Sequence, residues 1–239
     1  MTGKTILLFE AKSGSAPEGT RNALGPDDIF GAGRDIAWSA SGGVSAGSVH
    51  WNGKASIASF PHTESLVVVS GRLVLQSSGL TVHLTPGDSV VIGRGEAITA
   101  EAEKGTRWIF CATTAATLRT PGMVAIDRDV ALAPSAPPLA QFVEGNTPQC
   151  SQFRAYLDEA AGFRAGVWAT TPHVRLSRPH PVHELMYILE GQADVTDGDG
   201  TKTSVGPGDA IFVGRGTINR LSIHGNLKKI FAIVEGLES

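Results

Sequence analysis

The fold of this chain is decided by the stretch ELMYILEG, Glu184–Gly191, and by a second copy of its pattern, ESLVVVSG, at Glu64–Gly71. Another matching pair follows these stretches, PGDSVVIGRG at Pro86–Gly95 and PGDAIFVGRG at Pro207–Gly216. The first pair is offset by 120 residues and the second by 121. Self-similarity at a nearly fixed period indicates a repeated structural unit, so the sequence predicts two copies of one domain.

Within each copy, short apolar runs rich in Val, Ile and Leu alternate with turns made of Gly, Pro and Asp. This pattern is typical of an all-β sandwich or barrel, and a composition of 29 Gly, 13 Pro and 18% charged residues agrees with it. We predict an N-terminal domain over residues 1–125, which includes an extended arm with one strand near Asp35–Ser39, and a C-terminal domain over residues 126–239. The run Ala133–Pro138 is typical of a linker.

Composition and charge exclude several classes of partner. A net charge of -3 and the lack of a basic run give no electrostatic footprint for nucleic acid or for an anionic membrane. No stretch approaches the roughly 20 apolar residues that span a bilayer. Cys111 and Cys150 are isolated, so we expect buried, reduced thiols. A cytoplasmic protein with a small-molecule ligand is the expectation.

A cation, two imidazoles and a carboxylate gather in Arg178–Glu184, just before the apolar strand of the second copy. If this segment were one straight strand, four steps of roughly 3.3 Å would leave His180 and Glu184 about 13 Å apart. The chain must therefore bend for them to meet, and the two prolines beside His180 favour a bend. Because neighbours on a strand face opposite sides, His183 is the weaker candidate for a site.

Both copies resemble the cupin superfamily. The first motif of that family has His-x-His, three or four residues, Glu, six residues and Gly, and both copies keep the Glu, the six-residue strand and the Gly. Both also keep the Pro-Gly-Asp entry to the second motif. The C-terminal copy looks similar to the subfamily of ethanolamine-utilisation cupins and ureidoglycine aminohydrolases, through Gly166–Pro172, Thr196–Asp197 and Lys228–Lys229. The resemblance implies two tandem double-stranded β-helix (jelly-roll) domains.

In the N-terminal copy, the resemblance places Ala58 and Phe60 at the two histidine positions of the first motif and Ile98 at that of the second. Only Glu64 remains, with His62 out of register. Such side chains fill a small barrel, so we expect this domain to be structural.

In the C-terminal copy, the matching positions hold Arg178, His180, Glu184 and Asn219. An imidazole, a carboxylate and an amide oxygen could hold manganese, iron or zinc. Arg178 cannot ligate a cation, because a guanidinium has only donors. It either grips a substrate carboxylate or pairs with Glu184 in place of a metal, and His180 and Glu184 could simply bond each other.

Two strand residues, Met186 and Ile188, share the face of Glu184 by alternation and are expected to line the cavity. The leading hypothesis is a metal-dependent enzyme that acts on a small carboxylated metabolite, which can also contain nitrogen. The resemblance suggests an aminohydrolase first, then an isomerase or lyase. The competing hypothesis is a metal-free protein that binds a small anion without turnover. The sequence is compatible with a homodimer of the whole chain and does not decide the oligomeric state.

Overall fold

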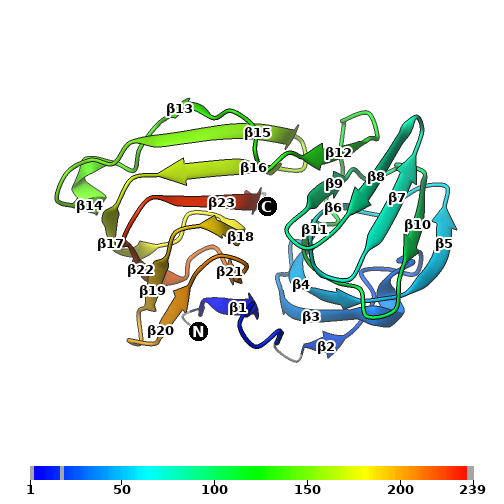
Figure 1. Ribbon diagram of the computed structural model, residues 1–239, viewed down its shortest axis with the longest axis horizontal. Coiled ribbons are helices and arrows are strands. Elements are labelled where there is room, and N and C mark those ends of the chain that lie inside the picture. The colour runs from blue at the N-terminus through cyan, green and yellow to red at the C-terminus, as the bar shows by residue number, and fades with distance from the viewer. Residues whose placement is uncertain (1–2, 17–18, 236–239) are drawn as a thin grey trace.

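The computed structural model describes residues 3–16 and 19–235, and it consists of two β-barrels that lie side by side (Figure 1). The predicted all-β fold is confirmed: apart from two single-turn 3-10 helices, at Gly31–Gly33 and Ala140–Phe142, the regular elements of the described chain are strands. Among the described residues no helix is long and apolar enough to cross a membrane.

The N-terminal barrel is built from a seven-stranded and a four-stranded sheet. The seven-stranded sheet has the order β12-β9-β6-β11-β4-β3-β2 and the other the order β5-β10-β7-β8. The strands are β2 Thr20–Arg21, β3 Arg34–Ser39, β4 Val44–His50, β5 Gly53–Ile57, β6 Thr63–Ser70, β7 Leu73–Ser77, β8 Leu80–Leu84, β9 Ser89–Ile92, β10 Ile98–Ala102, β11 Arg107–Thr113 and β12 Met123–Ile126. The strand predicted near Asp35–Ser39 is therefore β3.

The C-terminal barrel repeats this plan with a seven-stranded and a five-stranded sheet. Their orders are β1-β21-β18-β23-β16-β15-β13 and β14-β17-β22-β19-β20. The strands are β1 Ile6–Phe9, β13 Ala133–Ser135, β14 Val143–Glu144, β15 Cys150–Asp158, β16 Phe163–Thr170, β17 His173–Pro179, β18 His183–Glu190, β19 Ala193–Asp197, β20 Lys202–Val205, β21 Ala210–Val213, β22 Ile218–Ile223 and β23 Leu227–Val234.

The repeated sequence stretches occupy equivalent places in the two barrels. Strand β6 lies between β9 and β11, and strand β18 lies between β21 and β23. Glu64 is opposite Ile92 in the first barrel, and Glu184 is opposite Val213 in the second. The repeat found in the sequence therefore has the same register in both sheets.

Each barrel receives an edge strand from a segment that leads into the other. Strand β1, at the start of the chain, pairs with β21 of the C-terminal barrel, and Lys4 forms an ion pair of 2.7 Å with Asp199 there. Strand β12, which spans the predicted domain boundary, pairs with β9 of the N-terminal barrel. Strand β1 thus ties the start of the chain to the C-terminal barrel, whereas β12 completes the edge of the barrel whose strands precede it.

The outer faces of the two seven-stranded sheets share one hydrophobic core. Its members include Val67 and Ile109 from the first barrel and Leu185, Phe212 and Ile230 from the second. Each sheet thus buries one apolar face against the other, as packed sheets do, and turns its opposite face toward its own barrel. Both cysteines are free and buried, as expected. The burial of Leu185 here directs its neighbour Glu184 into the C-terminal barrel.

Candidate functional site

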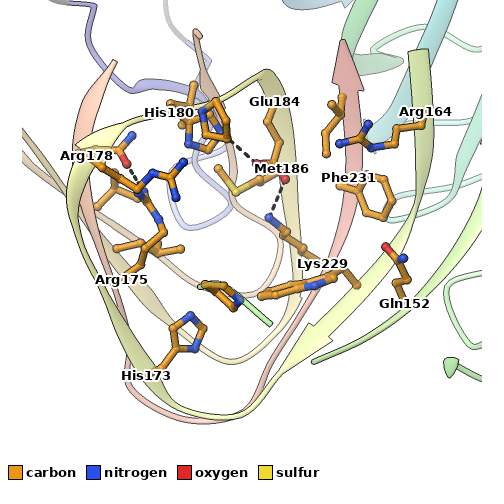
Figure 2. A pocket seen from close by; sticks show the side chains of 18 residues that line it. Gln152, Arg164, His173, Arg175, Arg178, His180, Glu184, Met186, Lys229 and Phe231 are labelled. Atoms are coloured by element: carbon orange, nitrogen blue, oxygen red, sulfur yellow. Dashed lines mark hydrogen bonds and ion pairs between the residues drawn. The ribbon is translucent and has the colours of Figure 1, made fainter. Parts of the chain in front are cut away.

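The interior of the C-terminal barrel contains a cavity of about 270 Å³ between its two sheets (Figure 2). The side chains that line it come from both sheets and from the connector before β14. Its polar members include Arg164, His173, Arg175, Arg178, His180, Glu184, Asn219 and Lys229, and its apolar members include Trp168, Met186, Leu221 and Phe231. All the site residues predicted from the sequence line this cavity, apart from Ile188.

The predicted bend between Arg178 and Glu184 is present. Strand β17 ends at Pro179 and β18 begins at His183, and the backbone of His180 in the turn bonds that of Thr217 and Gly216, just before the neighbouring strand β22, at 2.8 Å each. The bend brings His180 Nε2 to 3.1 Å from Glu184 Oε2. The imidazole and the carboxylate thus meet although they lie four positions apart in the sequence.

Glu184 is the centre of a buried polar cluster. His180 binds one of its oxygens, and Lys229 Nζ donates to the other, Oε1, at 2.8 Å. Burial by itself would raise the pKa of the Glu184 carboxyl, but the Lys229 ammonium and the hydrogen bond from His180 hold that pKa well below its usual range. Glu184 is therefore a carboxylate, and its charge is balanced by Lys229.

Two guanidinium groups project into the cavity from β17 on the opposite side. Arg175 donates to Asn219 Oδ1, and its second terminal nitrogen is buried without a hydrogen-bond partner in the described chain. Arg178 lies over the ring of Phe142, 4.3 Å from its centroid. Burial and the neighbouring charge of Arg178 lower the pKa of Arg175 to about 10. Like charges so placed, each without a carboxylate partner among the described residues, form a site that attracts an anion.

The third guanidinium group that lines the cavity belongs to Arg164, and it has a carboxylate partner. Arg164 forms an ion pair with Glu235 at the edge of the barrel, so its charge is balanced within the protein. The uncompensated positive charge of the cavity is therefore that of Arg175 and Arg178.

The structure places the other predicted residues as follows. Met186 lines the cavity, whereas Ile188, although on the same face of β18, is 2% exposed and packs in the core beyond it. His183 faces the opposite side, where its Nδ1 accepts a hydrogen bond of 3.0 Å from the backbone of Arg215 and its ring contacts Trp38. The cation that pairs with Glu184 is Lys229. The expected alternative in which Arg178 pairs with Glu184 is therefore wrong.

The side chains predicted to ligate a divalent metal ion in this cavity are already engaged with other groups of the protein. Both oxygens of Glu184 already accept hydrogen bonds, one of them from an ammonium, and the amide oxygen of Asn219 accepts from Arg175. No group of three His, Cys, Asp or Glu side chains with metal-binding geometry occurs in residues 3–16 and 19–235. The side chains as arranged do not fit an ion, because Lys229 holds a positive charge against the carboxylate that would ligate it.

Sequence reasoning missed Lys229 and Arg175 as site residues. Both had a detectable signal, which is a charged residue on the inward face of a strand. In LKKIFAIV, the sequence of β23, alternation puts Lys229 on the same face as Phe231 and Ile233. A charge on a face that is otherwise apolar indicates either a buried ion pair or a ligand site.

In the N-terminal barrel, the equivalent glutamate is sealed inside the protein. Glu64 forms an ion pair of 2.9 Å with Arg34 and accepts a hydrogen bond of 2.9 Å from His62, and all three side chains are fully buried. His62, expected to be out of register, does reach Glu64. Phe60 and Ile98 pack in the barrel core, so they fill it as predicted, although Arg34 from β3 was not foreseen.

Comparison with known proteins agrees with this architecture. The family model of the cupin domain matches residues 169–233. A crystal structure from Pseudomonas syringae pv. tomato str. DC3000, of a protein of unknown function in the DUF861 family, is 35% identical with a TM-score of 0.92, covering 97% of this chain and 99% of that one. No curated protein matches the chain.

More distant structures share the fold alone. A cupin 2 conserved barrel domain protein from Leptotrichia buccalis is 11% identical with a TM-score of 0.59, covering 98% of this chain and 97% of that one. Protein Ylba from E. coli, also of the DUF861 family, is 15% identical with a TM-score of 0.54, covering 87% of this chain and 85% of that one.

Proposed function

This chain belongs to the cupin superfamily, and from that premise we propose that its C-terminal barrel binds a small carboxylate, with Lys229 in place of a metal ion. The observation that carries the proposal is the pair Arg175 and Arg178. Two guanidinium groups share one side of a cavity, and neither has a carboxylate partner in the described chain. A carboxylate between them would relieve their repulsion and accept hydrogen bonds from both.

The size and walls of the cavity limit the rest of the ligand. A volume of about 270 Å³ lies just below the range of roughly 300–1,000 Å³ that is common for small-molecule sites. Met186, Leu221 and Phe231 supply apolar walls. These features suit a carboxylate with a short apolar body rather than a nucleotide or a sugar chain.

A metal-dependent reaction, such as that of an aminohydrolase, is the second candidate. It is favoured by one observation, that His180, Glu184 and Asn219 line the same cavity. It requires Lys229 to leave Glu184. Elemental analysis of the untagged protein after reconstitution separates the two candidates: we expect less than about a tenth of an equivalent of manganese, iron or zinc. One equivalent that is lost in His180→Ala would establish the metal site instead.

Calorimetric titration with pentanoate tests the proposal itself. Arg178→Ala is expected to weaken binding about tenfold or more, because it removes a charge-assisted hydrogen bond. The matched control is Arg220→Ala, on the neighbouring strand β22, since Arg220 lies outside the cavity and pairs with Glu144 at 2.6 Å. Equal losses in both variants, or no binding of any short carboxylate to the native protein, would overturn the proposal.

A further inference from the structure

Lys229 has donor capacity that the protein leaves unused. Its side chain lines the cavity and lies 4.9 Å from the centroid of the Trp168 ring. An ammonium carries three N–H donors, and its acceptor in the described chain is Glu184 Oε1 at 2.8 Å. Because a buried donor without an acceptor is costly, the remaining N–H groups call for an oxygen from a molecule in the cavity.

We propose that the ligand of this cavity is an oxo acid, whose carboxylate lies on Arg175 and Arg178 and whose carbonyl oxygen accepts a hydrogen bond from Lys229. This inference rests on the proposed binding of a carboxylate and names the second group that the cavity recognises. Figure 2 shows the geometry behind it: Arg175 and Arg178 project from one side of the cavity, and Lys229 approaches from the other beside Glu184. A ligand between them is held at both ends.

The charge balance around Lys229 selects a neutral oxygen over a second carboxylate. Glu184 is 8% exposed and already neutralises Lys229. A second anion at Lys229 would face the Glu184 carboxylate across a medium that screens poorly. A ligand with one charge, at the guanidinium end, avoids this repulsion.

The hydrogen-bond balance selects a carbonyl over a hydroxyl. Both Glu184 oxygens accept hydrogen bonds, from His180 and from Lys229. A ligand hydroxyl at Lys229 would bring a proton of its own, which would have to share a Glu184 oxygen that already accepts a hydrogen bond. A carbonyl brings no proton, and a site matched in this way discriminates against the analogue that leaves a polar group unpaired.

The test is a calorimetric titration with four acids of the same chain length: pentanoate, 2-hydroxypentanoate, 2-oxopentanoate and 4-oxopentanoate. We expect at least one oxo acid to bind about tenfold or more tightly than pentanoate, and more tightly than the hydroxy acid. Equal dissociation constants for pentanoate and both oxo acids would overturn the inference while leaving carboxylate binding intact. Tighter binding of the hydroxy acid would overturn the choice of a carbonyl. If none of the four binds, the proposed function itself has failed.

Two variants test whether Lys229 causes the preference for an oxo acid. Glu184→Gln is the background, because removal of Lys229 alone would leave a buried carboxylate uncompensated. We expect the oxo-acid preference to persist in Glu184→Gln and to disappear when Lys229→Met is added. The control is Lys228→Met, since Lys228 is the neighbour of Lys229 on β23 and lies near Glu190 instead, at 3.8 Å. Circular dichroism verifies the fold of each variant. If the double variant does not fold, the titration of the native protein with the four acids still tests the inference.

Discussion

The two barrels carry the same glutamate at matching positions, Glu64 and Glu184, and enclose it in different ways. In the N-terminal barrel, the ladder position beside Val49 and Val68 holds Trp108. In the C-terminal barrel, the equivalent position, beside Trp168 and Ile188, holds Lys229. The large aromatic side chain closes the first barrel, and the lysine leaves a cavity in the second.

Two further positions show the same contrast. Phe60, which is fully buried, corresponds to His180 at an offset of 120 residues. Arg34 pairs with Val49 across the sheet where Gln152 pairs with Trp168. Both glutamates bind a cation, Arg34 or Lys229, so the glutamate of the motif does not distinguish the barrels. The side chains around it determine which barrel can accept a ligand.

The largest expected effect comes from removing the cation of the sealed barrel. Arg34 binds Glu64 at 2.9 Å and Asp28 at 2.7 Å, with all three side chains fully buried. Arg34→Met removes the cation that the two buried carboxylates share and leaves them only His62 and backbone N–H groups as partners, so we expect a loss of about 3–5 kcal/mol in the free energy of unfolding. Urea unfolding measures it. Lys229→Met is the matched variant and should cost less, because the side chains of Lys229 and Glu184 are 9% and 11% exposed whereas those of Arg34 and Glu64 are 0% exposed. Equal costs would contradict the distinction between a sealed and an open barrel.

The next effect concerns the side chains that fill or line each barrel. Phe60→Ala is expected to cost about 3–5 kcal/mol, because it leaves a cavity in a packed core. His180→Ala, at the matching position, enlarges a cavity that already exists and should cost about 2 kcal/mol or less. The difference between the two urea midpoints measures the contrast. If His180→Ala were the more costly variant, the imidazole would be the structural side chain of the pair.

Prediction from sequence succeeded where the signal is local and failed where it depends on register. The repeat, the bend at His180 and the inward face of Met186 follow from turn residues and alternation. Ile188 lies on the predicted face, yet the core closes around it before the cavity begins. Lys229 and Arg34 were not predicted because each meets its glutamate from another strand of the sheet, and Lys229 lies 45 positions from Glu184 in the sequence.

The smallest effect is the pH dependence that Glu184 contributes. Burial raises the pKa of this carboxyl, but Lys229 and His180 lower it further, so it lies well below its usual range. A group with a lower pKa in the folded state stabilises the protein above its unfolded pKa, about 4.3 for Glu, and this stability is lost as the pH falls through the folded value. We expect the free energy of unfolding to decline from about pH 5 downward.

Glu184→Gln should show a shallower decline than the native protein in urea unfolding over this acid range. The control is Glu144→Gln, on the exterior of the same barrel, where Glu144 pairs with Arg220 and is 60% exposed. An exposed pair contributes little, so this variant should follow the native curve. A native decline that Glu184→Gln leaves unchanged would show that other carboxyl groups determine it.

The most direct measurement is a crystal structure of the untagged protein soaked with pentanoate. We predict a carboxylate in contact with Arg175 and Arg178, and Lys229 within hydrogen-bond distance of Glu184. An ion bonded to His180, Glu184 and Asn219, with Lys229 turned away from the carboxylate, would contradict it.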